Sequence, residues 1–252
     1  MLDRERSMPT QGYDITYLSL GAGVQSSALM IMSLLGMKNV PRVDVAVFAD
    51  TKGEPEWVYD QMTRLEEFAK KHGLQVDTVC VGDLAQDVID RHNGKRKRFA
   101  AIPVFTTGSD GDSVPLRRQC TSEYKIMPIQ KHIRRKLGVG YRQRIGDKKA
   151  LCLLGISIDE VQRMKPSRDK WVDNAFPLID VRMNRGDCME VLREFDLVPE
   201  GRSACVFCPY HSNKYWRRLK ELHPVEWERA CEYDKQFRNM EASGMKNPTY
   251  LH

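Results

Sequence analysis

Residues 15–32 read Ile-Thr-Tyr-Leu-Ser-Leu, then Gly-Ala-Gly-Val-Gln-Ser-Ser, then Ala-Leu-Met-Ile-Met. An apolar, β-branched run stops at a turn of small residues, and a helical pattern begins at once, so the sequence predicts a strand, a glycine loop and a helix N-terminus. Gly21 and Gly23 let the backbone approach a ligand closely, and Ser26 or Ser27 can cap the helix. Free N–H groups and the helix dipole favour an anion here, which makes the stretch a candidate phosphate cradle. The alternative is a tight strand–helix turn of the kind that any α/β protein can contain.

Strands and helices alternate after this first pair. Val43–Phe48 and Leu74–Val81 read as a second and a third strand with a helix between them, and Ala150–Ile156 reads as a further buried strand. This alternation implies right-handed βαβ units and a mainly parallel sheet, hence a doubly wound, Rossmann-like α/β fold. Ligands of such sheets bind at the carboxyl ends of the strands, where Gly21–Ser27 and Asp50–Glu56 both fall.

Composition sets the class of protein. The 252 residues can bury one large domain, or one domain and an appendage, and their formal charge of +6 permits a polyanionic partner. No apolar run is long enough to span a bilayer, and the charged N-terminus lacks the apolar core of a signal peptide, so we expect a cytoplasmic protein without a membrane partner. Seven cysteines in a reducing compartment point to metal or redox use rather than to disulfides.

The glycine loop is neither a Walker loop nor a Gly-x-Gly-x-x-Gly fingerprint. It resembles the PP-loop, Ser-Gly-Gly-x-Asp-Ser, of the ATP pyrophosphatase superfamily, which is adenine nucleotide α-hydrolase-like and includes phosphoadenylyl-sulfate (PAPS) reductases and nucleic-acid thiolation enzymes. In this alignment Gly21 replaces the first Ser, Ala22 the first Gly and Gln25 the Asp, whereas Gly23 and Ser26 are retained.

Two further segments are similar to blocks of the same family. Phe48-Ala-Asp50-Thr51, followed by Gly53-Glu54, looks like the segment after the second strand of reductase relatives, and Gly155 to Arg163 looks like a segment that lines the nucleotide pocket. Asp159 and Glu160 could hold Mg²⁺; the alternative for the second segment is a charged surface turn. The resemblance implies that ATP is bound by Ser19, Gly21, Ala22, Gly23, Gln25, Ser26, Ser27, Asp50, Thr51, Gly155 and Glu160.

The middle of the chain carries a cationic block behind a long loop. Residues 92–118 contain a basic cluster and a turn-rich stretch, and we interpret them as a flexible basic lid, with a solvated surface loop as the alternative. Cations and a cysteine then converge at a helix start, which suits anionic oxygens. This block resembles the Cys-Thr-x-x-x-Lys-x-x-Pro block of reductase-like PP-loop proteins, and the resemblance implies catalytic roles for Arg117, Arg118, Cys120, Lys125 and Arg163.

A second strong signal is Cys205-Val-Phe-Cys208-Pro, because two thiolates three residues apart before a proline are typical of an iron–sulfur site. No second pair of this kind exists, so the other ligands must come from separated positions, and Cys120 and Cys188 are the candidates. Cys80 and Cys152 lie inside apolar strands and are expected in the core. We predict a [4Fe–4S] cluster on Cys120, Cys205 and Cys208, with Cys188 as the fourth ligand or none; zinc and a redox-active cysteine pair are the alternatives.

These signals give a chain organised as a polar lead-in (1–14), a nucleotide-binding domain (15–198) and a cysteine loop with C-terminal helices (199–252). The single-domain size and the reductase-like blocks look most like the ATP pyrophosphatase of DNA phosphorothioation systems. The resemblance implies adenylation of a nucleic-acid acceptor, DNA before tRNA, followed by sulfur transfer with a cysteine desulfurase as donor. A homo-oligomer is compatible with these signals.

Three other functions stay open. A PAPS or adenylyl-sulfate reductase would share the middle blocks, but such enzymes use a cysteine on a C-terminal tail and this sequence has none after Cys231. A tRNA thiolation enzyme differs only in its acceptor. The third is a nucleotide-binding component without chemistry, which the replacement by Gln25 leaves room for.

Overall fold

The computed structural model describes residues 12–92, 95, 102–140, 142–238 and 247–251. Contacts divide the chain into two compact units. The first comprises the residues up to Ala49, Trp57–Val79 and Ile129–Ser203, and the second comprises Asp50–Glu56, Cys80–Pro128 and Ala204–His252. This division differs from the expected one, because the C-terminal segment shares its unit with the middle of the chain.

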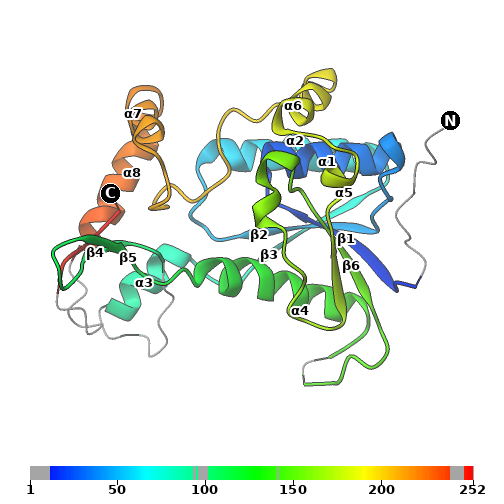
Figure 1. Cartoon of the computed structure of the whole chain (residues 1–252), viewed down its shortest axis with the longest axis horizontal. Coiled ribbons are helices and arrows are strands. Elements are labelled where there is room, and N and C mark those ends of the chain that lie inside the picture. The colour runs from blue at the N-terminus through cyan, green and yellow to red at the C-terminus, as the bar shows by residue number, and fades with distance from the viewer. Residues whose placement is uncertain (1–11, 93–94, 96–101, 141, 239–246, 252) are drawn as a thin grey trace. The chain divides into compact units, whose positions relative to one another are not determined.

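The first unit is built on a five-stranded sheet in the order β3-β2-β1-β6-β7. Strand β1 runs parallel to both β2 and β6, and β6 runs parallel to β7 (Figure 1). The strands are β1 Ile15–Leu20, β2 Val45–Asp50, β3 Gln75–Cys80, β6 Ala150–Leu154 and β7 Val172–Ala175. The predicted α/β fold with a mainly parallel sheet is confirmed.

The helices of this sheet cover both of its faces (Figure 1). They are α1 Val24–Leu35, α2 Glu56–Lys71, α4 Met127–Lys136, α5 Pro177–Asp180 and α6 Arg185–Glu194. Ile129 and Ile133 of α4, and Leu137 just after it, pack onto alternate residues of β1, β2 and β6, which is the face pattern expected of a pleated strand. Helix α1 is buried along almost its whole length because the sheet lies on one side of it and α6 packs against it.

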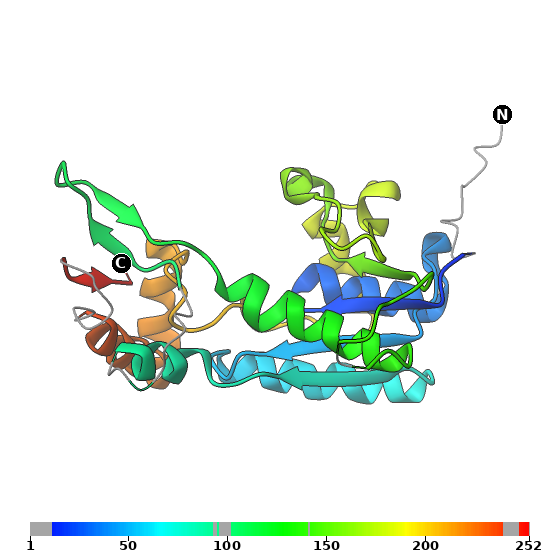
Figure 2. The same cartoon turned by 90° about the horizontal axis from the view of Figure 1, so that it is seen from below.

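The second unit has its own apolar core and a small antiparallel sheet in the order β5-β4-β8. Its elements are α3 Leu84–His92, β4 Phe105–Thr107, β5 Ser113–Pro115, α7 Asn213–Leu222, α8 Pro224–Phe237 and β8 Thr249–Tyr250 (Figure 2). The core joins Val88, Val104 and Tyr124 to Phe207 and Phe237, which explains why residues 204–252 do not form an appendage of their own.

Part of the predicted lid is an ordered hairpin. Strands β4 and β5 pair between residues 105 and 115, and Gly108 donates its N–H to the carbonyl of Asp112 at 2.7 Å, which closes the turn. Residues 93–94 and 96–101, which carry most of the basic cluster, lie outside the described residues, as do residues 1–11 of the lead-in. Within the described chain, none of the helices combines the length and the apolar character that a membrane crossing requires.

Candidate functional site

The loop after β1 forms an open helix N-terminus. Strand β1 ends at Leu20, and α1 begins at Val24. The N-cap residue is Gly23, which has an extended backbone and no side chain that could cap the helix. The first turn of α1 carries no acidic residue. Since the first N–H groups of a helix lack intrahelical partners, this end of α1 offers donors and a positive dipole to an anion.

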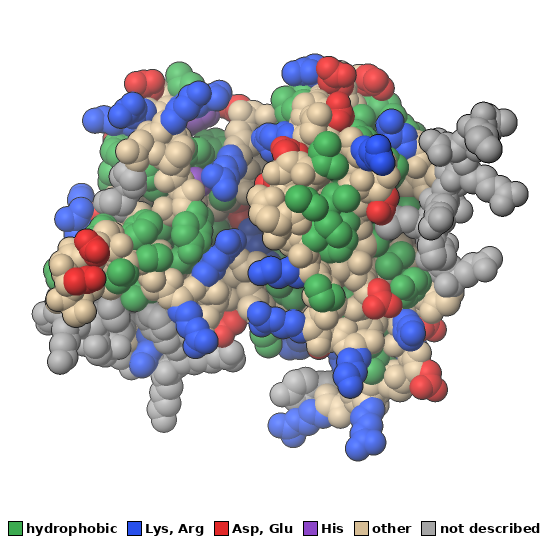
Figure 3. All heavy atoms as spheres, in the orientation of Figure 1, with side chains coloured by type: hydrophobic (Ala, Val, Ile, Leu, Met, Phe, Trp, Pro, Cys, Tyr) green, Lys and Arg blue, Asp and Glu red, His purple; other side chains and the backbone are tan. Residues whose placement is uncertain are grey.

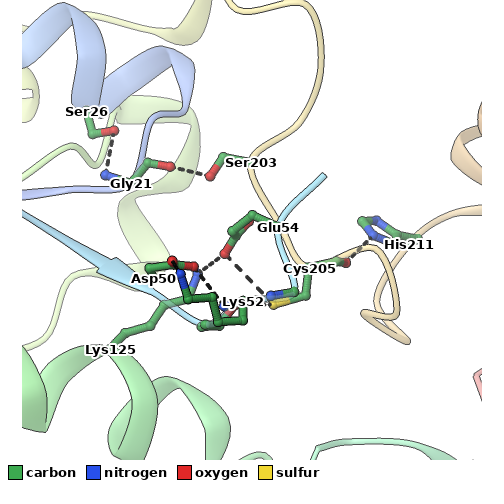
Figure 4. Close-up of polar contacts among 11 residues, drawn as sticks. Gly21, Ser26, Asp50, Lys52, Glu54, Lys125, Ser203, Cys205 and His211 are labelled. Atoms are coloured by element: carbon green, nitrogen blue, oxygen red, sulfur yellow. Dashed lines mark hydrogen bonds and ion pairs between the residues drawn. The ribbon is translucent and has the colours of Figure 1, made fainter. Parts of the chain in front are cut away.

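Close packing fixes the shape of the loop. A Cβ added at Gly155, in the segment after β6, would lie 2.6 Å from the backbone nitrogen of Ser26. Ser26 Oγ accepts from the Gly21 N–H and donates to the Gly23 carbonyl, both at 3.2 Å, and Ser203 Oγ donates to the carbonyl of Gly21 (Figure 4). Ala22 has φ of +54°, a conformation that a glycine adopts at less cost. The loop is therefore held by its own chain in a strained shape.

Gln25 joins the loop to two other segments of the first unit. Its Nε2 donates to Ser157 Oγ and to Glu160 Oε2, each at 3.3 Å, and its Oε1 accepts from Arg185 Nη1 at 3.0 Å. Glu160 also pairs with Arg163 at 2.6 Å. A neutral amide thus bridges a carboxylate and a guanidinium, and the departure from the PP-loop pattern has a structural use. Sequence reasoning missed Arg185, which no motif marks.

Asp159, which the sequence suggests as a Mg²⁺ ligand together with Glu160, is exposed in the segment after β6. Its pKa is lowered from 3.8, first by the hydrogen bond to Ser157 and also by backbone N–H groups, so it is a carboxylate at neutral pH. The Glu160 carboxylate, in contrast, already accepts from Gln25 and Arg163. Ser27 Oγ is fully buried in α1 and has no hydrogen-bond partner in the part of the chain that the structure describes, and Ser19 is half-buried in β1.

The segment after β2 belongs to the second unit, and its charged side chains pair with each other. Both carboxylate oxygens of Asp50 are used by Lys52, whose backbone N–H donates at 2.7 Å and whose Nζ lies at 2.8 Å. Thr51 Oγ1 lies 3.1 Å from the sulfur of Cys205. Asp50 and Thr51, which the resemblance assigns to ATP, are thus occupied by Lys52 and Cys205 in this structure.

An ion pair between a buried carboxylate and a partly exposed lysine lies beside Cys205. The Glu54 side chain is fully buried; its Oε1 lies 2.9 Å from Lys125 Nζ and 3.8 Å from Cys205 Sγ (Figure 4). Its Oε2 has no hydrogen-bond partner among the described residues. Burial raises the pKa of the Cys205 thiol to about 12, and the Glu54 carboxylate adds to this effect. Burial alone would lower the pKa of Lys125, but Glu54 outweighs it and the pKa rises. Cys205 is therefore a neutral thiol here.

Helix α8 clamps the same segment. The Arg229 guanidinium donates to the carbonyl of Lys52 at 2.9 Å and to that of Glu54 at 3.1 Å, and Glu226 accepts the N–H of Glu56 at 2.8 Å. A Cβ at Gly53 would lie 2.5 Å from the Phe207 ring, so the cysteine loop packs directly on this backbone. The C-terminal helix positions Glu54 as well as filling the core.

The predicted cluster ligands divide between the units. Cys120, Cys205 and Cys208 lie in the second unit, where Cys120 and Cys205 pack against the same core. Cys188 lies in α6 of the first unit and is fully buried, with its pKa raised to about 12 by burial. The soft thiol donors fit an iron–sulfur cluster. Nevertheless, no three Cys, His, Asp or Glu side chains within the described ranges are arranged to hold a metal ion.

The remaining cysteines have separate settings. Cys152 is buried in the core of the first unit, as expected. Cys80, in contrast, is exposed, because β3 is an edge strand whose outer residues face solvent; its expected place in the core is wrong. The turn between Cys205 and Cys208 is closed by a Cys208 N–H bond of 2.9 Å to the Cys205 carbonyl, which also lies 3.0 Å from His211 Nε2.

The predicted catalytic cations differ in their availability. Lys125 and Arg163 already neutralise Glu54 and Glu160. Arg117 and Arg118 are exposed before the π-helical turn Thr121–Ile126, and the Arg118 guanidinium lies 5.5 Å from the centre of the Tyr210 ring. These two arginines are the members of the set without a carboxylate partner among the described residues.

Comparisons with known proteins find similarity only among solved structures. No family model and no curated protein match this chain. A phosphoadenylyl-sulfate (PAPS) reductase from Candida auris, in a phosphate complex, is 14% identical over 74% of this chain and 75% of its own, with a TM-score of 0.41. The U34-tRNA thiolase NcsA from Methanococcus maripaludis, with its [4Fe–4S] cluster, is 11% identical over 95% of this chain and 76% of its own, with a TM-score of 0.46. Both are weak likenesses of fold, and neither assigns a substrate, cofactor or reaction to this chain.

Proposed function

We propose that this chain is a PP-loop ATP pyrophosphatase that adenylates an oxygen of a nucleic acid so that sulfur can replace that oxygen. The acceptor that we propose is a DNA backbone phosphate. The observation that carries the proposal is the Gly21–Ser27 loop, a helix N-terminus without a side-chain cap whose shape is fixed by contacts with Ser203 and Gly155. It offers backbone donors where a triphosphate needs them.

The chemistry balances in two displacements. An acceptor oxygen attacks the α-phosphorus of ATP, the bond between the α-phosphorus and the bridging oxygen breaks, and pyrophosphate leaves with the electron pair. Hydrosulfide, for which a cysteine desulfurase and a thiol reductant are the source, then attacks the adenylated phosphorus. AMP leaves with the original oxygen, and the acceptor becomes a phosphorothioate.

In this reaction the residues of the chain bind the nucleotide and balance its charge. The loop amides hold the phosphates, and Asp159 holds the Mg²⁺ that accompanies ATP. The resemblance assigns Arg117 and Arg118 to the charge that develops on pyrophosphate, whereas Lys125 and Arg163 pair with Glu54 and Glu160. A [4Fe–4S] cluster held by Cys120, Cys205 and Cys208 would supply a site for sulfide. The Cys205 thiol has to lose its proton before it binds iron.

Product analysis tests the reaction. Anaerobically purified protein is incubated with Mg-ATP, with and without duplex DNA or tRNA, and phosphorus NMR follows the nucleotides. We expect AMP and pyrophosphate, formed faster with DNA. The double variant Arg117→Gln/Arg118→Gln should lose at least about tenfold in rate, whereas Lys70→Gln/Lys71→Gln, which removes two exposed cations from α2, should not.

Two outcomes would contradict the proposal. Sulfite formed from adenylyl sulfate, with ATP left intact, would make the protein a reductase. Binding of ATP without turnover in the presence of either nucleic acid would make it a nucleotide-binding component. Stimulation by tRNA and not by DNA would keep adenylation and change the acceptor.

Iron and sulfide content test the ligands separately. After anaerobic reconstitution, Cys120→Ala, Cys205→Ala and Cys208→Ala should each lose the cluster, and Cys231→Ala, a half-buried cysteine of α8, should keep it. Cys188→Ala distinguishes three protein ligands from four. Zinc bound in place of iron by the wild type would contradict the cluster.

A further inference from the structure

One segment of the first unit carries the positive charge of the whole protein. Residues 131–149 hold eight of the 40 Lys and Arg residues and one of the 34 Asp and Glu residues, so their formal charge is +7 against +6 for the chain. The other 233 residues together are therefore close to neutral, at −1. These 19 residues are the end of α4 and the loop that leads to β6, and we call them the basic segment.

Structural roles use part of this charge. Lys136 lies 3.0 Å from Asp77, Arg134 donates to the carbonyl of Gln143 at 2.6 Å, and Lys148 donates to the carbonyl of Leu137. The Lys148 bond caps a carbonyl at the end of α4, where cations are expected to balance the helix dipole. One or two cations are enough for that purpose, and the segment has several more.

Lys131 and Arg142 also interact with other residues, so three of the eight cations are left for another purpose. Arg135, Arg144 and Lys149 are exposed and make no ion pair within the described chain. The Arg134 guanidinium, one position before Arg135, lies 6.0 Å from the ring centre of Trp171. Figure 3 shows Lys and Arg side chains gathered low in the view, where Figure 1 places α4 and the loop before β6.

The basic segment is separate from the glycine loop. Because β1 and β6 are parallel, the start of β6 lies at the amino ends of the strands and the end of β1 lies at their carboxyl ends. Strands of this length separate their amino and carboxyl ends by about 20 Å. The segment therefore does not hold the triphosphate. Exposed, long side chains fit a row of phosphates rather than a single buried phosphate.

We propose that Arg135, Arg144 and Lys149 form a contact surface for a nucleic-acid backbone. A duplex offers one negative charge per about 1.7 Å of its axis, so three separated cations can each meet a phosphate and release counterions. Choosing nucleic acid over another polyanion rests on the proposed function. The surface holds the acceptor at a distance from the chemistry and carries no sequence information.

Binding in the absence of ATP tests the surface. Fluorescence anisotropy of a labelled DNA duplex, at salt concentrations between about 50 and 200 mM, gives the Kd and its salt slope. The triple variant Arg135→Gln/Arg144→Gln/Lys149→Gln should bind at least about tenfold more weakly, with a slope smaller by about 2 to 3. The matched control, Lys70→Gln/Lys71→Gln/Arg193→Gln, loses the same charge from exposed positions of α2 and α6 and should bind as the wild type does.

The result separates this inference from the proposed function. Equal Kd and slope for the triple variant and the wild type, equal weakening by both triple variants, or no binding of duplex by the wild type would each overturn the contact surface. Selective weakening by the triple variant supports it even if ATP is never cleaved, because the binding assay contains no nucleotide.

Discussion

Arg185 Nη1 donates to Gln25 Oε1 at 3.0 Å across 160 residues of chain, while the other end of the same amide donates to Glu160. Gln25 occupies the place of the aspartate in the motif that the loop resembles. A carboxylate there could pair with Arg185 but could not donate to Glu160, whereas an amide serves both neighbours. An amide at this position therefore suits the two side chains that face it, Glu160 and Arg185.

Exchanging the amide and the carboxylate tests this relationship. Gln25→Glu should lower the free energy of unfolding by about 1–2 kcal/mol, because an acceptor then faces Glu160 and a donor is lost. The double variant Gln25→Glu/Glu160→Gln restores one donor between the two side chains and should recover most of the loss. Urea unfolding measures both; a double variant with the summed loss of the single variants would contradict the pairing.

Gly155 should not tolerate a methyl group. A Cβ there would lie 2.6 Å from the Ser26 nitrogen and 2.7 Å from its Cα, so the loop backbone would have to move. We expect Gly155→Ala to lower the free energy of unfolding by about 1–3 kcal/mol, as overpacking does. Gly36→Ala is unsuitable as a control, because its φ of +65° adds strain of a different kind. Gly23→Ala, with no contact closer than 3.6 Å, is the matched comparison and should lose less in the same unfolding measurement.

Arg229 should matter for the segment that carries Glu54. Arg229→Ala removes two charge-assisted bonds to the carbonyls of Lys52 and Glu54, each worth about 1.5–3 kcal/mol when well formed and less for a partly exposed side chain. Hydrogen exchange of residues 52–56 should become faster in this variant. Lys235→Ala, which breaks only an exposed ion pair of the same helix, should leave this exchange unchanged.

Asp77 gives the first unit a pH-dependent contribution. Burial alone would raise its pKa, but the hydrogen bonds and charges of His132 and Lys136 outweigh burial, so the pKa is lowered from 3.8. A depressed carboxyl pKa stabilises the fold above the unfolded value and loses this effect as the pH falls through the folded value. Asp77→Asn should therefore be less stable than the wild type at pH 7, with the difference shrinking below 3.8 in urea unfolding. A difference that stayed constant with pH would contradict the cause.

The sheet could be predicted because its strands carry their signal locally. The first strand, Ile15–Leu20, lies where its apolar run predicts it, and the second, Val45–Asp50, begins and ends two residues later than the predicted Val43–Phe48. Strand β7, Val172–Ala175, reads Val-Asp-Asn-Ala and has no such run, so only its pairing with β6 reveals it. Cys80 shows the converse, since an apolar run does not tell an edge strand from a central one.

The candidate sites could be predicted in part. Glycine loops and cysteine pairs are local patterns, so Gly21–Ser27 and Cys205–Cys208 were identifiable from spacing. The residues that hold the glycine loop and the segment after β2 lie 160 or more positions away from their partners in the sequence and carry no motif; they are Arg185, Ser203 and Arg229. The second unit escaped prediction for the same reason, because its core joins residues 84–124 to residues 206–251.

The most direct test of a triphosphate at the glycine loop is calorimetric titration of α,β-methylene-ATP into the wild type and into Gly21→Ala/Gly23→Ala. The added Cβ atoms would meet nothing closer than 3.8 and 3.6 Å, so the fold should tolerate both, as parallel unfolding measurements can check. A ligand that approaches the loop backbone, however, would clash with the added Cβ atoms. We predict a folded variant that binds the analogue at least about tenfold more weakly, the loss of about 1.4 kcal/mol of binding free energy. An unchanged Kd in the folded variant would contradict ATP binding at Gly21–Ser27.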